Sequence, residues 1–269
     1  MTIVLPPPVP LPSVTASLPP SGRSLNTACR GLPSPLSPAL SNLLDRLPPQ
    51  DDCKGLRIIL AHTGTAFNPD LLTSEAERRA RLEDVHAALD RVESLVFLDT
   101  ESTGGRYGRL IEVALVETDV EQNIMGGLHF RCNPHRRSQA RARRVHGIQD
   151  CELEHCPEFA ARADELLEVV RGKTVVIHDR TMDLLWLNRE LQAARPGAPR
   201  FEDRCTVVDS FVLARAIPSE RRRNGLDALL EWYGLGARGG HHDAYGDAAL
   251  LSRVFFELWW DLDEWLYGE

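Results

Sequence analysis

The stretch LVFLDTE, residues 95–101, places four apolar side chains directly before an Asp-Thr-Glu triplet. A continuous apolar run of this length predicts a strand that is buried on both faces of a sheet. Because side chains alternate along a strand, Asp99 and Glu101 point to one side and Thr100 to the other. Two neighbouring carboxylates repel each other, and a divalent cation, which prefers oxygen ligands, removes that cost. By itself the pattern is weak, since many strands end in solvated acidic residues.

The periodicity of the chain around this stretch predicts a mixed sheet. Short links join strands expected at 95–101, 109–118 and 123–132, which indicates an antiparallel meander. Further along we expect a helix at 157–170, a strand at 174–178, and helices at 182–194, 209–216, 225–233 and 244–266. We therefore predict an α/β fold in which an antiparallel meander and parallel strands form one mixed β-sheet flanked by helices.

Composition divides the 269 residues into three parts. Residues 1–50 hold 12 of the 18 prolines, which predicts a disordered Pro-rich arm. Residues 51–93 form an N-terminal extension with a helix expected at 75–92, and residues 94–269 form the main domain. The arm is either a plain linker or a docking peptide for a protein partner, and the plain linker is the simpler interpretation.

Charge and hydropathy narrow the functional classes. With a formal net charge of −8, a nucleic-acid binder needs local basic patches or metal ions to hold phosphates. No apolar run approaches the ~18 residues of a membrane span, and we see no secretory signal, so we expect no membrane contact and a cytoplasmic location. The six cysteines have no disulfide-framework spacing, which agrees with reduced thiols.

Further acidic residues lie where two helices are expected to begin. Asp183 belongs to the first turn after the short buried strand, where the helix dipole favours a negative side chain. Asp179 is expected to be the N-cap of that helix. Asp243 is expected to cap the last helix, which places Asp247 about one turn inside it and leaves His242 on the preceding loop.

Together these segments resemble the three motifs of the DEDDh exonucleases. This is the DnaQ-like group of the RNase H-like superfamily, and it includes the proofreading epsilon subunits of bacterial replicases. The matching segments are DTESTG at 99–104, Ile177-His178 followed by Asp183, and His242 five residues before Asp247. VHGI at 145–148 and two linking segments, at 209–215 and 223–229, resemble the family as well. The likeness covers about residues 94–260.

The resemblance implies a metal-dependent 3′–5′ exonuclease that releases nucleoside 5′-monophosphates from single-stranded or frayed DNA ends. Two divalent metal ions, Mg²⁺ or Mn²⁺, suit the hydrolysis of phosphodiesters at a carboxylate site. The expected metal ligands are Asp99, Glu101, Asp183 and Asp247. His242 is the expected general base, since histidine titrates near the working pH and the spacing to Asp247 selects it over His241.

The resemblance also implies a set of side chains around the terminal nucleotide. The expected substrate-binding residues are Thr100, Ser102, Thr103, His146, His178, Asp179 and Met182. Asp179 and Met182 depart from the family, which has Asn and an aromatic residue at these positions; this alters the pocket but removes no metal ligand.

The chain also stops soon after its last helix, where the replicative subunit continues into a polymerase-binding tail.

The motifs are also compatible with two other functions. The same motifs serve RNA 3′-end trimming in enzymes such as RNase T and oligoribonuclease, because ribose discrimination depends on the shape of the pocket. A non-catalytic module for nucleic-acid binding or assembly is the third interpretation. The complete set of four carboxylates and one histidine favours an enzyme, because a decayed site is expected to have lost a ligand.

Two further groups of residues have alternative interpretations. An arginine-rich run comprises Arg136, Arg137, Arg141, Arg143 and Arg144. It either holds phosphates of the strand behind the scissile bond or is a solvated loop, and the sequence favours neither. A zinc site is disfavoured, because the spacing of the available ligands fits no common finger. Those ligands are His146, Cys151, His155 and Cys156.

Overall fold

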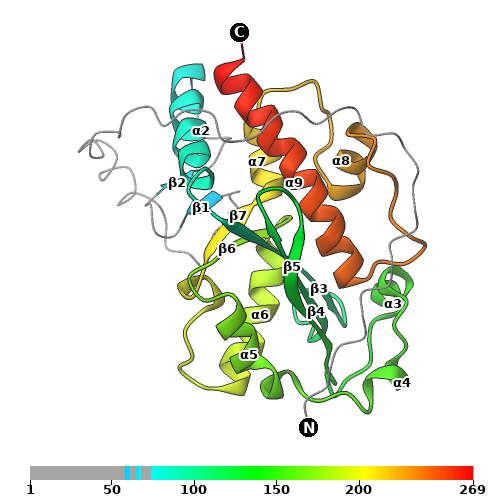
Figure 1. Cartoon of the computed structure of the whole chain (residues 1–269). Helices are drawn as coiled ribbons and strands as arrows, with labels where there is room; N and C mark the ends of the chain where they lie inside the picture. The colour runs from blue at the N-terminus through cyan, green and yellow to red at the C-terminus, as the bar shows by residue number, and fades with distance from the viewer. Residues whose placement is uncertain (1–57, 61–64, 68–73, 269) are drawn as a thin grey trace. The chain divides into compact units, whose positions relative to one another are not determined.

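The structure, a computed structural model, describes residues 58–60, 65–67 and 74–268 (Figure 1). The Pro-rich arm predicted for residues 1–50 lies outside these described residues. Within the described part of the chain, no helix is long and apolar enough to cross a membrane. Two short strands, β1 (Ile58–Leu60) and β2 (Thr65–Phe67), pair antiparallel near the start of the described chain.

The core of the domain is a five-stranded mixed sheet in the order β5-β4-β3-β6-β7. Its strands are β3 (Ser94–Ser102), β4 (Leu110–Asp119), β5 (Ile124–Arg131), β6 (Thr174–Ile177) and β7 (Thr206–Asp209). β3, β4 and β5 form an antiparallel meander, whereas β6 and β7 run parallel to β3. The fold predicted from the sequence, a meander extended by parallel strands, is confirmed.

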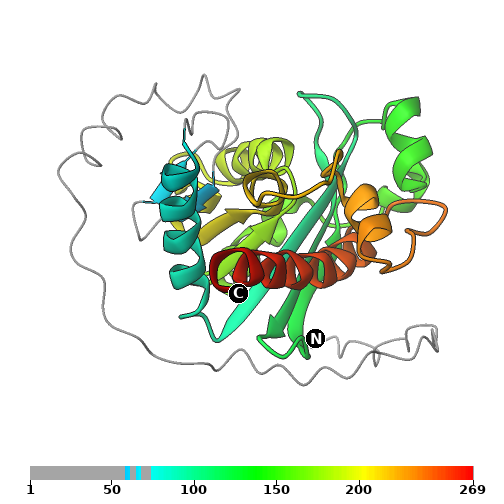
Figure 2. The same cartoon turned by 90° about the horizontal axis from the view of Figure 1, so that it is seen from above.

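Helices cover both faces of this sheet, and the alternation of side chains along β3 divides the core between them. Leu95 and Phe97 pack with one group of helices, and Val96 and Leu98 pack with the other. The first group is α2 (Glu75–Leu89), α7 (Ser210–Ala216), α8 (Leu226–Trp232) and α9 (Ala244–Tyr267). The second is α5 (Ala163–Val169) and α6 (Thr181–Ala194). Figure 2 shows α9 crossing its face of the sheet, with α2 beside its C-terminal end.

Several elements differ from the sequence-based expectation. The helix predicted at 157–170 is a 3₁₀ turn, Phe159–Ala161, followed by α5, because Arg162 departs from helical geometry with φ −115°. The helix predicted at 75–92 ends at Leu89. The sequence analysis missed β7 and two short helices, α3 (Ala140–His146) and α4 (Asp150–Leu153). A further 3₁₀ turn spans Phe201–Asp203.

The register of the sheet leaves the end of β3 open. β6 stops pairing with β3 at Ile177, opposite Leu98. Asp99 and Glu101 therefore extend beyond the last residue of β6. The β3–β4 ladder shifts register between Glu101 and Ser102, and a bulge of this kind re-aims side chains beside many active sites. Side chains from α6 and α9 can reach this end of the sheet.

Candidate active site

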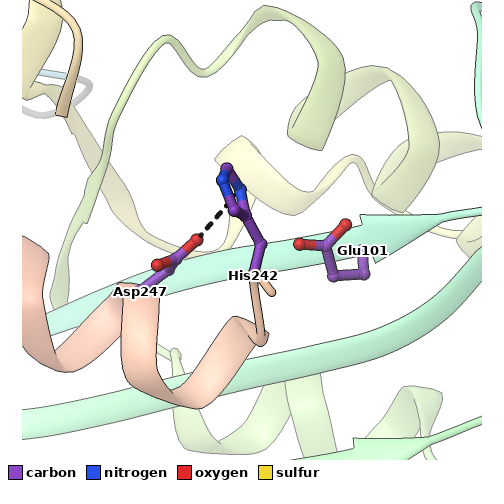
Figure 3. Close-up of side chains that lie close together, drawn as sticks. All are labelled: Glu101, His242 and Asp247. Atoms are coloured by element: carbon purple, nitrogen blue, oxygen red, sulfur yellow. Dashed lines mark ion pairs between the residues drawn. The ribbon is translucent and has the colours of Figure 1, made fainter. Parts of the chain in front are cut away.

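Three of the five predicted catalytic residues meet at this end of the sheet. Figure 3 shows Glu101 projecting from β3, Asp247 from the first turns of α9, and His242 from the loop before that helix. Their ligand atoms all lie within 4.8 Å of one another. Asp243 is the N-cap of α9 and accepts a hydrogen bond from Gly246 N at 2.8 Å, as the sequence predicted. Among the described residues, Glu101, His242 and Asp247 are the group of acidic and histidine side chains that lie close enough together to hold a metal ion.

The two neighbouring histidines differ in their surroundings: His242 lies beside Glu101 and Asp247, and His241 lies elsewhere. The main-chain N–H of His242 donates to Val145 O at 2.9 Å, which ties the loop to the end of α3. The His241 ring instead lies against Gly147, where an added Cβ would stand 2.7 Å from the ring. Gly147, at φ +72°, therefore has two reasons to be glycine: its backbone conformation and the close approach of His241. That His242 rather than His241 acts as the general base stays a prediction.

Asp183 reaches the same region from the other face of the sheet. It is the third residue of α6 and is 9% exposed. Thr100, which points away from Asp99 and Glu101, donates its hydroxyl to Asp183 Oδ1 at 2.6 Å. Thr100 thus orients a predicted metal ligand from a buried position.

Burial and crowding make these carboxylates hard to ionise. Burial is the largest cause, and it raises the pKa of Glu101 to about 8 and of Asp183 to about 7. Burial and the charges of the three other carboxylates raise the pKa of Asp99 well above its ordinary value. The pKa of Asp247 is raised by burial, against the lowering effect of Arg238. An array of this kind is costly without cations, and divalent ions bound to the oxygens would remove the repulsion.

Arg238 places a positive charge inside this acidic group. Its Nη1 donates to Asp247 Oδ2 at 2.7 Å and lies 2.8 Å from His242 Nδ1. Its Nε lies 2.8 Å from Asp227 Oδ1 on α8. Sequence reasoning missed Arg238, because it stands in a glycine-rich segment between two motifs and matches no pattern.

Asp209 is a second residue that sequence reasoning did not place at the site. It is 2% exposed at the end of β7, and its carboxylate accepts the main-chain N–H of Asp179 (3.2 Å) and of Arg180 (3.3 Å). The same carboxylate caps α7 through the N–H of Phe211 and Val212. Asp209 therefore fixes the turn that leads into α6 and hence the position of Asp183.

The predicted N-cap role of Asp179 is wrong. The N-cap of α6 is Arg180, which makes no side-chain capping bond. Asp179 is exposed and has left-handed backbone geometry, with φ +57°. The turn between β6 and α6 needs this conformation, which Asp tolerates better than most residues. The carboxylate of Asp209 accepts the main-chain N–H of Asp179, and the side chain of Asp179 does not cap the helix.

The other predicted substrate-binding residues differ in burial and in hydrogen bonding. His178 Nδ1 lies 2.9 Å from Ser210 Oγ, and burial lowers the pKa of His178 to about 4, so the ring is neutral. His146 is buried and its Nδ1 accepts the N–H of Ile148 at 3.0 Å. Met182 is half-buried in the first turn of α6. Contact with substrate stays a prediction for all three.

Ser102 and Thr103 are both buried and organise the chain that leaves β3. Ser102 Oγ accepts the N–H of Gly104 at 3.2 Å, and Thr103 Oγ1 accepts the N–H of Arg109 at 2.9 Å. Their hydroxyls serve the following loop. Direct contact between either residue and substrate also stays a prediction.

Comparison with known proteins places this geometry in a family. A family model described as "Exonuclease" matches residues 96–255, which contain all five predicted catalytic residues. The chain belongs to the exonuclease family. The resemblance read from its motifs is thereby confirmed, and the domain is a 3′–5′ exonuclease of the DnaQ-like type. Exonucleases of this family depend on divalent metal ions.

Relatives and solved structures agree with this assignment. The exonuclease domain is 34% identical over 168 residues to the DNA polymerase III subunit epsilon of Rickettsia conorii, covering 61% of this chain and 72% of that protein. It is 33% identical over 172 residues to the epsilon subunit of Escherichia coli, covering 61% and 70%.

The fold matches E. coli Exonuclease I in a zinc-bound complex with single-stranded DNA, with a TM-score of 0.51 and 19% identity. That match covers 65% of this chain and 41% of Exonuclease I. A complex of Exonuclease I with a dA16 oligonucleotide gives a TM-score of 0.51, 22% identity and coverage of 61% and 42%. At such identities the likeness concerns the fold alone, which is RNase H-like.

Proposed function

We propose that this exonuclease hydrolyses phosphodiester bonds at the 3′ end of single-stranded or frayed DNA and releases nucleoside 5′-monophosphates. The observation that supports the proposal is the grouping of Glu101, His242 and Asp247 at the open end of β3, where their ligand atoms lie within 4.8 Å of one another. Asp99 lies close enough to interact with Glu101, Asp183 and Asp247, which adds two further carboxylates to this end of the sheet. The epsilon subunits to which the chain is similar belong by name to a DNA polymerase.

Asp99, Glu101, Asp183 and Asp247 are the residues that would hold two divalent ions. Carboxylate oxygens suit Mg²⁺ and Mn²⁺. The raised pKa values of these side chains support the proposal, because bound cations would stabilise their ionised forms. When bound, such ions activate water and stabilise the negative charge of the transition state. The hydrogen bond from Thr100 would hold the Asp183 carboxylate in place for this role.

His242 is the proposed general base. It stands on a loop beside Glu101 and Asp247, where its ring can accept a proton from the attacking water. Its Nδ1 faces Arg238 Nη1 at 2.8 Å. A nitrogen that accepts a hydrogen bond is not free to take a proton. His242 Nε2 also lies 3.4 Å from Arg238 Nη1. The His242 ring and the Arg238 guanidinium must therefore separate before either ring nitrogen is free to accept a proton.

Arg238 and a cation would share Asp247. The Oδ2 atom that accepts the hydrogen bond from Arg238 is one of the oxygens available to a metal ion. A cation held by this oxygen would compete with the guanidinium of Arg238, which also pairs with Asp227.

End-labelled oligonucleotides test the proposal. Single-stranded DNA and RNA of one sequence, labelled at the 5′ end, are incubated with the protein in Mg²⁺, Mn²⁺ or EDTA. We expect a descending ladder from DNA with either metal, nucleoside 5′-monophosphates as products, and no cleavage in EDTA. The Asp247→Asn variant is the matched control. Faster cleavage of RNA would move the assignment to RNA trimming, and the absence of cleavage with tight DNA binding would favour the non-catalytic module.

A further inference from the structure

The loop between β3 and β4 is held in place by side chains of two other parts of the domain. Three successive main-chain carbonyls, those of Gly105, Arg106 and Tyr107, each accept a hydrogen bond from a distant side chain. The donors are, in that order, Trp186 Nε1 at 3.2 Å, Arg189 Nη1 at 2.8 Å and Arg136 Nη1 at 3.0 Å. Two of these donors belong to α6 and one precedes α3, so the loop is braced on both sides.

The base of the same loop is fixed as well. Arg109 makes two bonds to Glu190, from Nε at 2.5 Å and from Nη2 at 2.8 Å, and Glu190 is 3% exposed. Thr103 N donates to Arg109 O at 2.9 Å, which closes the loop. Three glycines give this connection many accessible backbone conformations, and these contacts restrict them.

The hydrogen-bonded loop exposes an aromatic ring to solvent. Tyr107 is 76% exposed at the tip of the loop, and the guanidinium of Arg189 lies 5.5 Å from the centre of its ring. An exposed aromatic side chain adds little to the stability of the fold. A ring whose backbone is already fixed loses little conformational entropy when a ligand stacks on it.

The surroundings of Tyr107 are strongly basic. Segments 102–110 and 133–145 contain seven arginines and no acidic residue, in a chain whose net charge is −8. The exposed members are Arg106, Arg136, Arg137, Arg141 and Arg144. A hydrogen bond from Gln139 N to Thr103 O at 2.8 Å holds the two segments together. This patch supplies the local positive charge that a nucleic-acid binder of negative net charge needs.

The patch also borders the catalytic residues. Its first segment leaves β3 directly after Glu101, and its second ends at Val145, whose carbonyl accepts the N–H of His242 at 2.9 Å. A strand whose 3′ end lies among the carboxylates must leave the site over a neighbouring surface. This neighbouring surface joins exposed arginines to an exposed aromatic ring.

We propose that Tyr107, Arg136, Arg137 and Arg141 form a docking surface for the substrate strand. A base on the 5′ side of the terminal nucleotide stacks on Tyr107, and neighbouring phosphates contact the arginines. Stacking on aromatic rings and backbone contacts to arginine are how proteins hold single strands without reading their sequence. The inference rests on the proposed function and adds to it a residue-level path for single-stranded DNA.

Substrates of two lengths distinguish the contribution of this surface from that of the catalytic site. The p-nitrophenyl ester of thymidine 5′-monophosphate occupies the site alone, whereas dT12 also crosses the patch. For Tyr107→Ala we expect KM on dT12 to rise by about 5- to 100-fold, the usual worth of one stacked base, with kcat and ester hydrolysis unchanged. Tyr107→Phe is expected to behave as the wild type. Tyr267→Ala is the matched control, because Tyr267 is 57% exposed but lies about 30 Å along α9 from Asp247.

Salt dependence tests the arginines. Binding of fluorescently labelled dT12 is measured in the Asp247→Asn background, so that the strand stays intact. Replacing Arg137 and Arg141 together by alanine is expected to lower the slope of log K against log salt by about 1.4, or about 0.7 for each lost phosphate contact on a single strand. Arg171→Ala, at the opposite end of β6, is expected to leave the slope unchanged.

The outcomes are distinct. An unchanged KM on dT12 in Tyr107→Ala, or an equal loss with dT12 and the ester, would overturn the docking surface. An unchanged slope of log K against log salt in the double arginine variant would also overturn the docking surface. Binding of dT12 that depends on Tyr107, in a wild-type protein that hydrolyses neither substrate, would support the surface and contradict the proposed function.

Discussion

Replacing Glu112 by glutamine tests how the start of α9 is held on the sheet. Glu112 lies on β4 directly opposite Glu101 and is 0% exposed. Its carboxylate accepts hydrogen bonds from His129 Nε2 (3.1 Å) and Arg131 Nε (2.8 Å), and from the N–H of Ala244 (3.0 Å). Ala244 is the first residue of α9, so Glu112 connects the meander to the helix that carries Asp247.

The structure gives the size of the effect. Burial acts to raise the pKa of Glu112, but the hydrogen bonds from His129, Arg131 and Ala244 outweigh it and lower the pKa from 4.5 to about 2. At about 1.4 kcal/mol per pH unit, this corresponds to about 3 kcal/mol of stability. Because the folded pKa is below the unfolded one, the contribution is complete above pH 4.5 and is lost as the pH falls towards 2.

We expect Glu112→Gln to lower the free energy of unfolding by about 2–3 kcal/mol at pH 7, and the difference from the wild type to shrink below pH 4. Urea denaturation at pH 7, 5 and 3.5 measures both. Glu152→Gln is the control: Glu152 pairs with Arg131 at 3.1 Å but is half-exposed, so its loss is expected to cost less than 1 kcal/mol. Equal losses in both variants, or a difference that does not depend on pH, would refute the reasoning.

Three further expectations concern the site. His242→Ala should lower kcat by about 10²–10⁴-fold and His241→Ala should leave it nearly unchanged, in steady-state assays on dT12; the reverse order would mean that the third motif is misplaced. Arg238→Gln should increase the rise in melting temperature produced by Mn²⁺, because a competitor for Asp247 Oδ2 is removed; a smaller rise would show that Arg238 assists the cation. Asp179→Asn should raise the unfolding free energy by about 0.5 kcal/mol, because the Asp179 charge opposes ionisation of Asp183 and Asp209. The same change should lower KM for short oligonucleotides, and an unaltered KM would place Asp179 outside the nucleotide pocket.

The sequence predicted those parts of the fold that local patterns determine. The apolar run before Asp99 gave the central strand, because burial on both faces leaves a continuous signature. The position of Asp243 before an amphipathic helix predicted the start of α9, since a side-chain cap is a local interaction. The spacing of His242 and Asp247 followed from the same helix.

The features that the sequence did not predict depend on tertiary contacts. β7 is only four residues long and runs directly into α7, so its apolar run is shorter than a strand signal requires. Arg-rich α3 has no apolar stripe to mark it as a helix. The N-cap expected of Asp179 fails because the carboxylate of Asp209, on another strand, already holds the turn. Arg238 reaches the site from a loop that no pattern marks.

The central claim is that Asp99, Glu101, Asp183 and Asp247 together hold two divalent ions, and titration calorimetry with Mn²⁺ tests it most directly. Thymidine 5′-monophosphate is present to occupy the product position. We expect two ions per wild-type molecule, and fewer in an Asp99→Asn variant that remains folded by circular dichroism, because Asp99 lies close enough to interact with the three other carboxylates. No binding by the wild type, or the same stoichiometry and affinity in Asp99→Asn, would contradict the account.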